Sequence, residues 1–124
     1  MLELRDGLVK AMFAAMREER VPKIARSLRQ RLPAQTRALD DAALERWVRE
    51  TVGRAATHGL EVEWDLQRFV WLELIHGPRF DESCPWAASI LAQPRLSGTI
   101  RADMLESYHR NYLEDGGGSP RPAT

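Results

Sequence analysis

Apolar side chains recur at helical spacing along most of the chain, and the alternation typical of a half-buried β-strand is scarcely seen. The first stripe lies in residues 3–19 and consists of Leu4, Leu8, Met12 and Met16, widened by Val9 and Phe13. A second stripe follows Pro22, a residue that favours the first turn of a helix, and ends at Pro33. The pattern predicts two separate helices, at about 3–19 and 22–32, each of which buries its stripe.

Capping signals mark the helix ends in the rest of the chain. Asp40 and Ser97 are suited to be N-caps, because their side chains accept bonds from free backbone N–H groups. Gly59 and Gly77 follow apolar periods and are able to take the left-handed conformation that closes a helix. Pro85 fits a first helical position. These signals predict helices at about 40–58, 63–76, 85–93 and 97–112, with a loop over 79–84.

Together these elements predict an all-α fold, a compact bundle of five to six helices. The chain has 124 residues, a usual length for one domain. Residues 1–114 are therefore predicted to form a single helical domain. Residues 115–124 hold three glycines, two prolines and no large apolar side chain, so they are expected to form a flexible tail.

Basic and acidic side chains are equal in number over the whole chain, but they are unevenly distributed along the sequence. The 18 basic and 18 acidic side chains argue against a general polyanion binder. Residues 20–37 carry six bases and no acids, whereas residues 61–82 carry six acids and two bases. The basic segment is either a solvated face or a surface that docks an acidic partner. It lacks interleaved aromatic residues, and the linker 32–40 is too long for a helix-turn-helix, so no nucleic-acid partner is expected.

Cellular location is predicted from two features of the sequence. Cys84 is the single cysteine, so an intrachain disulfide framework is impossible. The first residues carry charges at Glu3, Arg5 and Asp6 and do not resemble a secretory signal. No stretch approaches the roughly 20 apolar residues of a membrane span. We therefore expect a cytoplasmic protein with no membrane partner.

No motif that carries a reaction is present. His58 and His76 each precede a glycine at a predicted helix end, where an imidazole serves as a cap. The acids of 61–65 lie at a predicted helix start, where they complement the helix dipole. Asp81 and Glu82 are expected to be exposed in a turn. Metal-ligand spacings and phosphate-binding glycine loops are also missing, so we predict no catalytic residue, cofactor or metal.

Tryptophan and arginine supply the candidate partner surface. Trp64 and Trp71 are seven residues apart and therefore share one face of a helix. They either extend the core or contact a partner, because Trp and Arg are enriched at binding hot spots. The candidate partner-binding residues are Trp64, Arg68, Trp71, Arg26 and Arg29.

Two segments of the C-terminal half resemble a known family. Residues 55–81 end in a Gly-x-x-Phe-Asp loop, and residues 85–92 read Pro-Trp-Ala-Ala-Ser-Ile-Leu-Ala before Leu-Ser-Gly at 96–98. This order resembles small helical bacterial proteins of unassigned biochemistry, typically encoded beside type VI secretion genes for spike-tip (PAAR-type) proteins and effectors. The resemblance implies an accessory or chaperone-like role in loading an effector, and it supplies no catalytic residue. The positions expected to be structural are Gly59, Gly77, Phe80, Asp81, Pro85 and Trp86.

The expected function is that of a non-catalytic interaction protein. The first hypothesis is an adaptor or chaperone for a type VI secretion effector or spike component. One alternative is an immunity protein whose acidic patch at 61–65 plugs a basic toxin site. A small helical enzyme or a nucleic-acid-binding regulator are the further alternatives. The sequence leaves the oligomeric state open.

Overall fold

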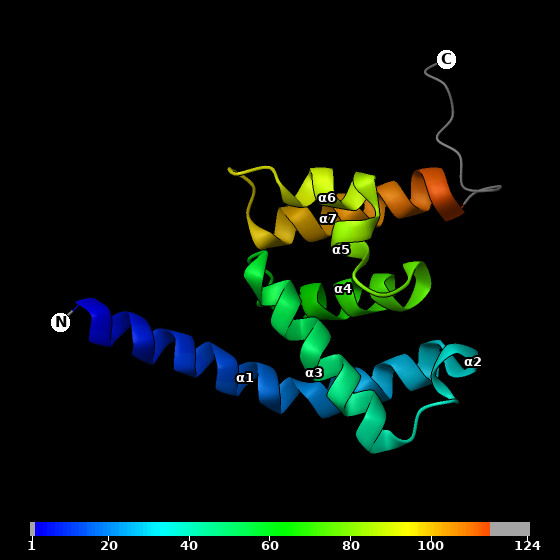
Figure 1. Ribbon diagram of the computed structural model, residues 1–124, viewed down its shortest axis with the longest axis horizontal. Coiled ribbons are helices and arrows are strands. Elements are labelled where there is room, and N and C mark those ends of the chain that lie inside the picture. The colour runs from blue at the N-terminus through cyan, green and yellow to red at the C-terminus, as the bar shows by residue number, and fades with distance from the viewer. Residues whose placement is uncertain (1, 115–124) are drawn as a thin grey trace, which may run out of the picture.

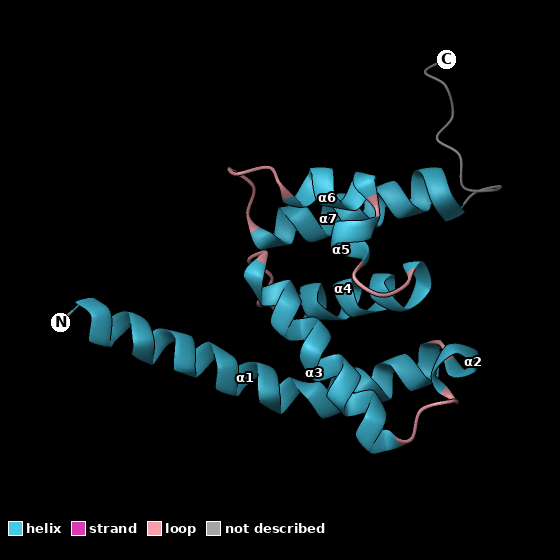
Figure 2. Cartoon of the chain, in the orientation of Figure 1, coloured by secondary structure: helices cyan, strands magenta, loops and turns pink. Residues whose placement is uncertain are grey.

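A computed structural model describes residues 2–114 of the chain. The elements in order are α1 (Leu2–Arg31), α2 (Pro33–Thr36), α3 (Asp41–Thr57), α4 (Glu63–His76), α5 (Phe80–Ser83), α6 (Pro85–Leu91), α7 (Gly98–Tyr108) and the π-helix η1 (His109–Glu114). Residues 2–114 contain helices and loops but no strand (Figure 2). The predicted all-α fold is confirmed. The predicted tail, residues 115–124, lies outside the described residues.

The helices enclose one apolar core. Figure 1 shows α1 on one side of the molecule, the α6–α7 pair on the other and α4 between them, with α3 crossing obliquely. The fully buried apolar side chains come from six helices and the loop after α3, and they include Ile24 of α1, Val48 of α3, Phe69 of α4, Phe80 of α5 and Leu105 of α7. The apolar stripes predicted for the second, third and fourth helical segments therefore meet in one place.

One continuous helix replaces the two that were predicted before residue 33. α1 runs through Pro22, and its ribbon bends as it passes α3 (Figure 1). A proline inside a helix removes a backbone hydrogen bond and costs about 3 kcal/mol. Val21, Ile24 and Leu28 are each no more than 3% exposed, and this burial offsets the cost. The prediction that Pro22 begins a new helix is wrong because tertiary packing outweighs the local preference.

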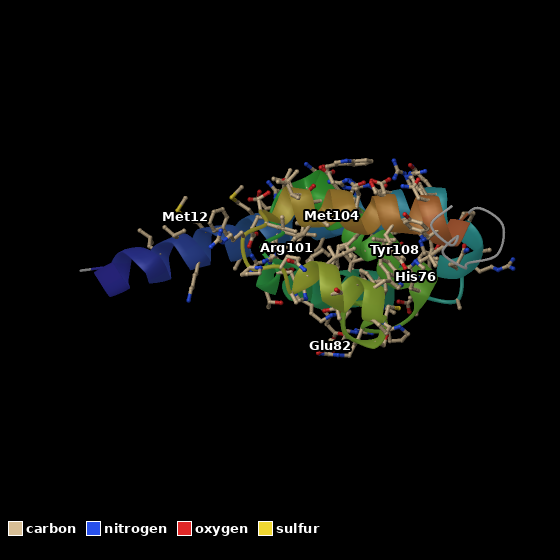
Figure 3. All side chains as sticks on the ribbon, turned by 90° about the horizontal axis from the view of Figure 1, so that it is seen from above. Met12, His76, Glu82, Arg101, Met104 and Tyr108 are labelled. Carbon is tan, nitrogen blue, oxygen red and sulfur yellow. The ribbon has the colours of Figure 1, made fainter. Side chains whose placement is uncertain are left out.

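The first half of α1 extends beyond the rest of the molecule (Figures 1 and 3). From residue 7 onward its large apolar side chains are exposed, from 40% at Met16 to 65% at Leu8; they are Leu8, Val9, Met12, Phe13 and Met16. Leu4 of the predicted stripe lies outside the residues whose side chains are described. The prediction that this stripe is buried is wrong, because nothing in residues 2–114 covers it. We call these five side chains the α1 stripe.

The end of α3 and the start of α7 meet backbone to backbone. Gly59 closes α3 with φ of 85°, as its sequence position predicts. Gly98 lies against it so closely that an added Cβ would be 2.6 Å from the Gly59 carbonyl carbon. Arg101 of α7 donates to the carbonyl oxygen of His58 at 2.9 Å, which satisfies a free carbonyl at the end of α3. The C-terminal helices are thereby seated on α3.

The predicted N-caps are both confirmed. The Asp40 side chain accepts a bond from the backbone N–H of Ala43, and the Ser97 side chain accepts one from Ile100. The last predicted helix divides in two, because α7 passes into η1 after Tyr108. Local capping chemistry therefore predicts where these helices begin, but not the change of helix type near the end.

The segment predicted as a loop over 79–84 contains the short helix α5. Gly77 before it has φ of 101°, and Arg79 takes a left-handed conformation with φ of 57°. Phe80 is fully buried and Asp81 is 4% exposed, which corrects the expectation that Asp81 is exposed. After α5, Pro85 occupies the first turn of α6. The turn therefore folds back into the core instead of facing solvent.

Candidate functional site

Two carboxylates and two bases from α3, its C-cap, α4 and α5 form one buried ion cluster. Arg54 of α3 pairs with Glu73 of α4 and, at 2.9 Å, with Asp81 of α5. The Nε2 atom of His58 lies 2.9 Å from the other Asp81 oxygen. The side chains of Glu73 and Asp81 are 3% and 1% exposed. The cluster joins the three helices where the chain turns back after α4.

The two carboxylates of this cluster form ion pairs and hydrogen bonds that stabilise the fold. Glu73 also accepts the backbone N–H groups of Arg79 at 2.9 Å and Phe80 at 3.3 Å, which holds the left-handed turn. Burial alone would raise the pKa of Asp81, but the bonds from His58 and Arg54 hold that pKa below its usual value. Asp81 is thus a charged structural group and not an acid with a raised pKa.

A second ion cluster joins α4 to α7. Arg68 donates to Asp65 at 2.7 Å, to Asp103 at 2.6 Å and to Glu106 at 3.1 Å. Burial lowers the pKa of Arg68, yet bonds to three carboxylates outweigh it and raise that pKa above its usual value. Arg68 is 8% exposed. The expectation that Arg68 contacts a partner from an exposed position is wrong, because α7 covers it.

Two histidines meet where the end of α4 contacts the start of η1. His76 Nε2 lies 2.9 Å from His109 Nδ1, and His76 is in the last turn of α4, as predicted. Trp71 packs its ring edge-on to His109, with 4.9 Å between the centroids. Trp86 contacts His76 at 5.2 Å and stacks on Tyr108 at 4.9 Å. Aromatic side chains thus surround the histidine pair, and Trp71 and Trp86 are structural.

Protonation of His76 opposes folding. Burial first, and the neighbouring His109 second, lower the pKa of His76. A histidine whose folded pKa is depressed binds its proton more readily in the unfolded chain. Stability is therefore complete above the unfolded pKa, about 6.5, and is lost as the pH falls below it. We expect urea unfolding to show a smaller free energy at pH 5.5 than at pH 7.5. In His76→Phe the difference between the two pH values should shrink, and an unchanged difference would refute this assignment.

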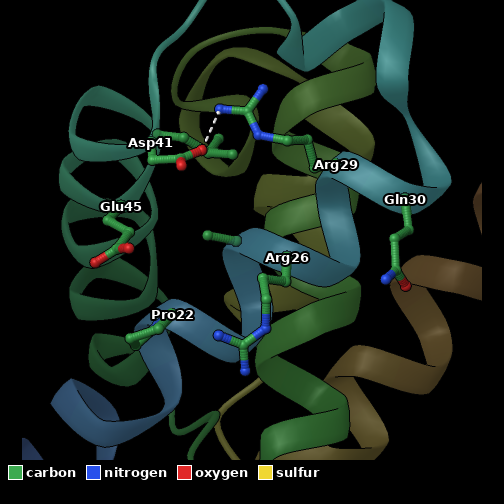
Figure 4. A pocket seen from close by; sticks show the side chains of 8 residues that line it. Pro22, Arg26, Arg29, Gln30, Asp41 and Glu45 are labelled. Carbon is green, nitrogen blue, oxygen red and sulfur yellow. Dashed lines mark ion pairs between the residues drawn. The ribbon is translucent and has the colours of Figure 1, made fainter.

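Part of α1 and part of α3 enclose an open groove of about 400 Å³ (Figure 4). Its floor is formed by apolar side chains, those of Pro22, Ala25 and Leu44. Arg26 lines the α1 side and Glu45 the α3 side, and Arg29 pairs with Asp41 across the groove at 3.1 Å. Arg29 also donates to the carbonyls of Thr36 and Leu39, so it mainly holds the α1–α3 connection.

The candidate partner residues do not form one surface. Trp64 is 49% exposed, and the guanidinium carbons of Arg31 and Arg68 lie 5.6 and 5.8 Å from its ring centroid. Arg26 is exposed at the groove between α1 and α3. Of the five candidates, therefore, Trp64 and Arg26 keep an exposed side chain. The acidic patch proposed for 61–65 is not formed either, because Glu61 pairs with Arg17 at 2.9 Å and Asp65 is buried.

The α1 stripe is the feature that sequence reasoning assigned to the wrong environment. The sequence carried no signal for its exposure. Eight of the ten residues from 7 to 16 are apolar and Lys10 is the single charge, and a helix segment that is apolar on nearly all sides is normally buried. A periodic stripe is expected to face its own core, and the pattern alone gives no sign that the core is elsewhere.

Comparisons with protein families, curated proteins and solved structures give no significant match to this chain. Within the described residues, no three His, Cys, Asp or Glu side chains lie together in a way that would hold a metal ion. None of the helices in this range has the length and hydropathy to span a bilayer. The surface features that could bind a partner are therefore the α1 stripe, the groove and the residues beside them.

Proposed function

We propose that this protein is a non-catalytic interaction protein that binds another protein through the projecting half of α1. The observation that carries the proposal is the α1 stripe, five large apolar side chains each at least 40% exposed. Monomeric proteins rarely leave such a contiguous patch in water, and patches of this kind mark protein-binding sites. The two buried ion clusters support the proposal, since their charged groups are bound to one another and serve the fold.

The cellular role that we propose is that of a cytoplasmic adaptor or chaperone for a type VI secretion effector or spike component. The order of the Gly-x-x-Phe-Asp loop and the Pro-Trp-Ala segment supports this role by resemblance. A rigid body with one projecting apolar helix suits an accessory protein, because the body stays folded whether or not the helix is occupied. A partner helix or groove would remove the stripe from water.

The test is co-expression with the proteins encoded next to the gene and capture through a tag on this chain. We expect a neighbouring effector, its non-toxic domain or a spike component to be retained at defined stoichiometry. The double variant Met12→Ser/Met16→Ser should lower the retained amount at least tenfold. Ile100→Ser is the matched control, because Ile100 is 47% exposed on α7, away from α1. Equal capture by both variants would refute the role of α1.

The same experiment separates the adaptor from the immunity protein. An adaptor binds a spike component or a non-toxic domain, whereas an immunity protein binds the toxic domain alone and protects cells that express it. Capture of the toxic domain alone, with protection, would therefore replace the adaptor hypothesis.

A further inference from the structure

The α1 stripe does not end where the helix reaches the body of the protein. Residues advance by about 100° each around an α-helix, so positions seven apart lie on nearly the same line. Lys23 follows Met16 by seven residues, and Arg26 stands five full turns after Leu8. Because α1 is continuous through Pro22, the line of the α1 stripe continues past the exposed Glu19 to Lys23 and Arg26. The two parts would have been unrelated on two separate helices.

The two cations on this line are available. Lys23 and Arg26 are exposed and form no ion pair in the part of the chain that the structure describes. Two other bases of this segment bond within the fold, whereas Arg37 is exposed but follows α2 and is not part of α1. Arg20 donates to the carbonyl of Glu61, and Arg29 pairs with Asp41. Lys23 and Arg26 are therefore the free positive charges on the line that continues the α1 stripe.

The exposed area of the α1 stripe is too small for a stable interface by itself, so a partner must also contact neighbouring residues. Five apolar side chains at about half exposure make a patch on the order of 500 Å². A stable protein interface covers about 800 Å² on each partner. The groove between α1 and α3 adjoins the line at Arg26 and adds an apolar floor (Figure 4). Figure 3 shows Met12 on the projecting part of α1, so the surface runs from there to the groove.

We propose that α1 binds an acidic amphipathic helix of a partner protein, whose apolar face covers the α1 stripe and whose carboxylates meet Lys23 and Arg26. This inference rests on the proposed function, and it adds the chemistry of the partner surface and where its apolar and acidic parts lie along α1. Asp41 and Glu45 edge the groove on the α3 side, so the partner carboxylates lie on the α1 side. A pairing of this kind takes its binding energy from apolar contact and its specificity from charge.

Two fluorescent 18-residue helical peptides test the proposal. Both carry a leucine stripe at i, i+4 spacing, flanked by glutamates in one and by lysines in the other. Fluorescence anisotropy with the full chain at 0.15 M salt should show the glutamate peptide binding at least tenfold more tightly. Equal binding, or tighter binding of the lysine peptide, would overturn the proposal.

Charge reversal locates the contact. The double variant Lys23→Glu/Arg26→Glu should bind the glutamate peptide at least tenfold more weakly, and it should bind the lysine peptide more tightly than the glutamate peptide. The matched control is Arg37→Glu/Arg46→Glu, which makes the same charge change at exposed positions that do not continue the stripe. Thermal unfolding checks that both variants remain folded. Equal effects of the two double variants would overturn the proposal, because they would indicate a general charge effect.

Two other occupants would also overturn it. Self-association that depends on concentration and is abolished by Met12→Ser would assign the stripe to a second copy. Tighter binding to phosphatidylglycerol vesicles than to the glutamate peptide would assign it to a lipid surface. If neighbouring proteins are captured through Met12 while the two peptides bind equally, the proposed function stands and this inference fails. If capture does not depend on Met12, the proposed function itself fails.

Discussion

Replacing Glu73 by alanine is expected to lower the free energy of unfolding by about 3–5 kcal/mol, the usual cost of removing one partner from a buried ion pair. Glu73 is 3% exposed, pairs with Arg54 and accepts two backbone N–H groups. Without it, Arg54 keeps a single carboxylate partner, Asp81, and the N–H groups of Arg79 and Phe80 lose their acceptor. Urea unfolding followed by circular dichroism measures the change.

The control for this variant lies on the same turn. Glu82→Ala removes a carboxylate that pairs with Arg79 from an exposed position. Exposed pairs contribute 0–1 kcal/mol, so Glu82→Ala should leave the unfolding midpoint nearly unchanged. If the two variants lose equal stability, the Arg54 cluster does not hold α3, α4 and α5 together, and its role in the fold must be revised.

Gly98→Ala should destabilise the protein by about 3 kcal/mol or more, at the upper end of what an added methyl group costs in a packed interior. A Cβ there would lie 2.6 Å from the Gly59 carbonyl carbon and 3.1 Å from the Leu60 backbone nitrogen. Backbone cannot rotate away as a long side chain does. α7 must therefore separate from the end of α3, which also strains the Arg101 bond to His58. Thermal and urea unfolding both report this loss.

Gly53→Ala supplies the matched control for Gly98→Ala. Gly53 is exposed within α3, and an added Cβ there meets nothing within 4 Å. Alanine has a higher helix propensity than glycine, so this variant should gain about 0.5–1 kcal/mol. The same substitution therefore has opposite signs at the two positions. Equal destabilisation would mean that the contact with Gly59 has no special cost.

Helix boundaries were predictable wherever a local signal sets them. The 63–76 helix has the predicted bounds, because Gly77 ends it with a positive φ. Asp40 and Ser97 cap the helices that follow them. Each of these signals acts within one turn of the chain. Pro22 was misread for the same reason, since its local preference for a helix start is real but small beside the burial of Ile24 and Leu28.

The candidate site was only partly predictable. The sequence indicated that the 20–37 segment is basic, and it placed Arg26 on a possible partner surface. It did not indicate that Arg68 is covered by Asp103 and Glu106, because those acids are about 35 residues away along the chain. The apolar stripe at 8–16 was recognised but assigned to the core. Periodicity shows which side chains share a face, not what that face meets.

The sequence by itself determined the all-α class and most helix ends, because both depend on side chains within a few residues of one another. The tertiary structure decided that α1 is one helix, that its first half projects into solvent, and that Arg68, Glu73 and Asp81 are internal. Each of these features depends on which segments, distant in the sequence, come into contact. Those contacts are set by the apolar surface that the whole chain buries when it folds. The line from Met16 to Lys23 depends on both. The sequence sets which side chains share this face of α1, and the fold leaves that face exposed to a partner.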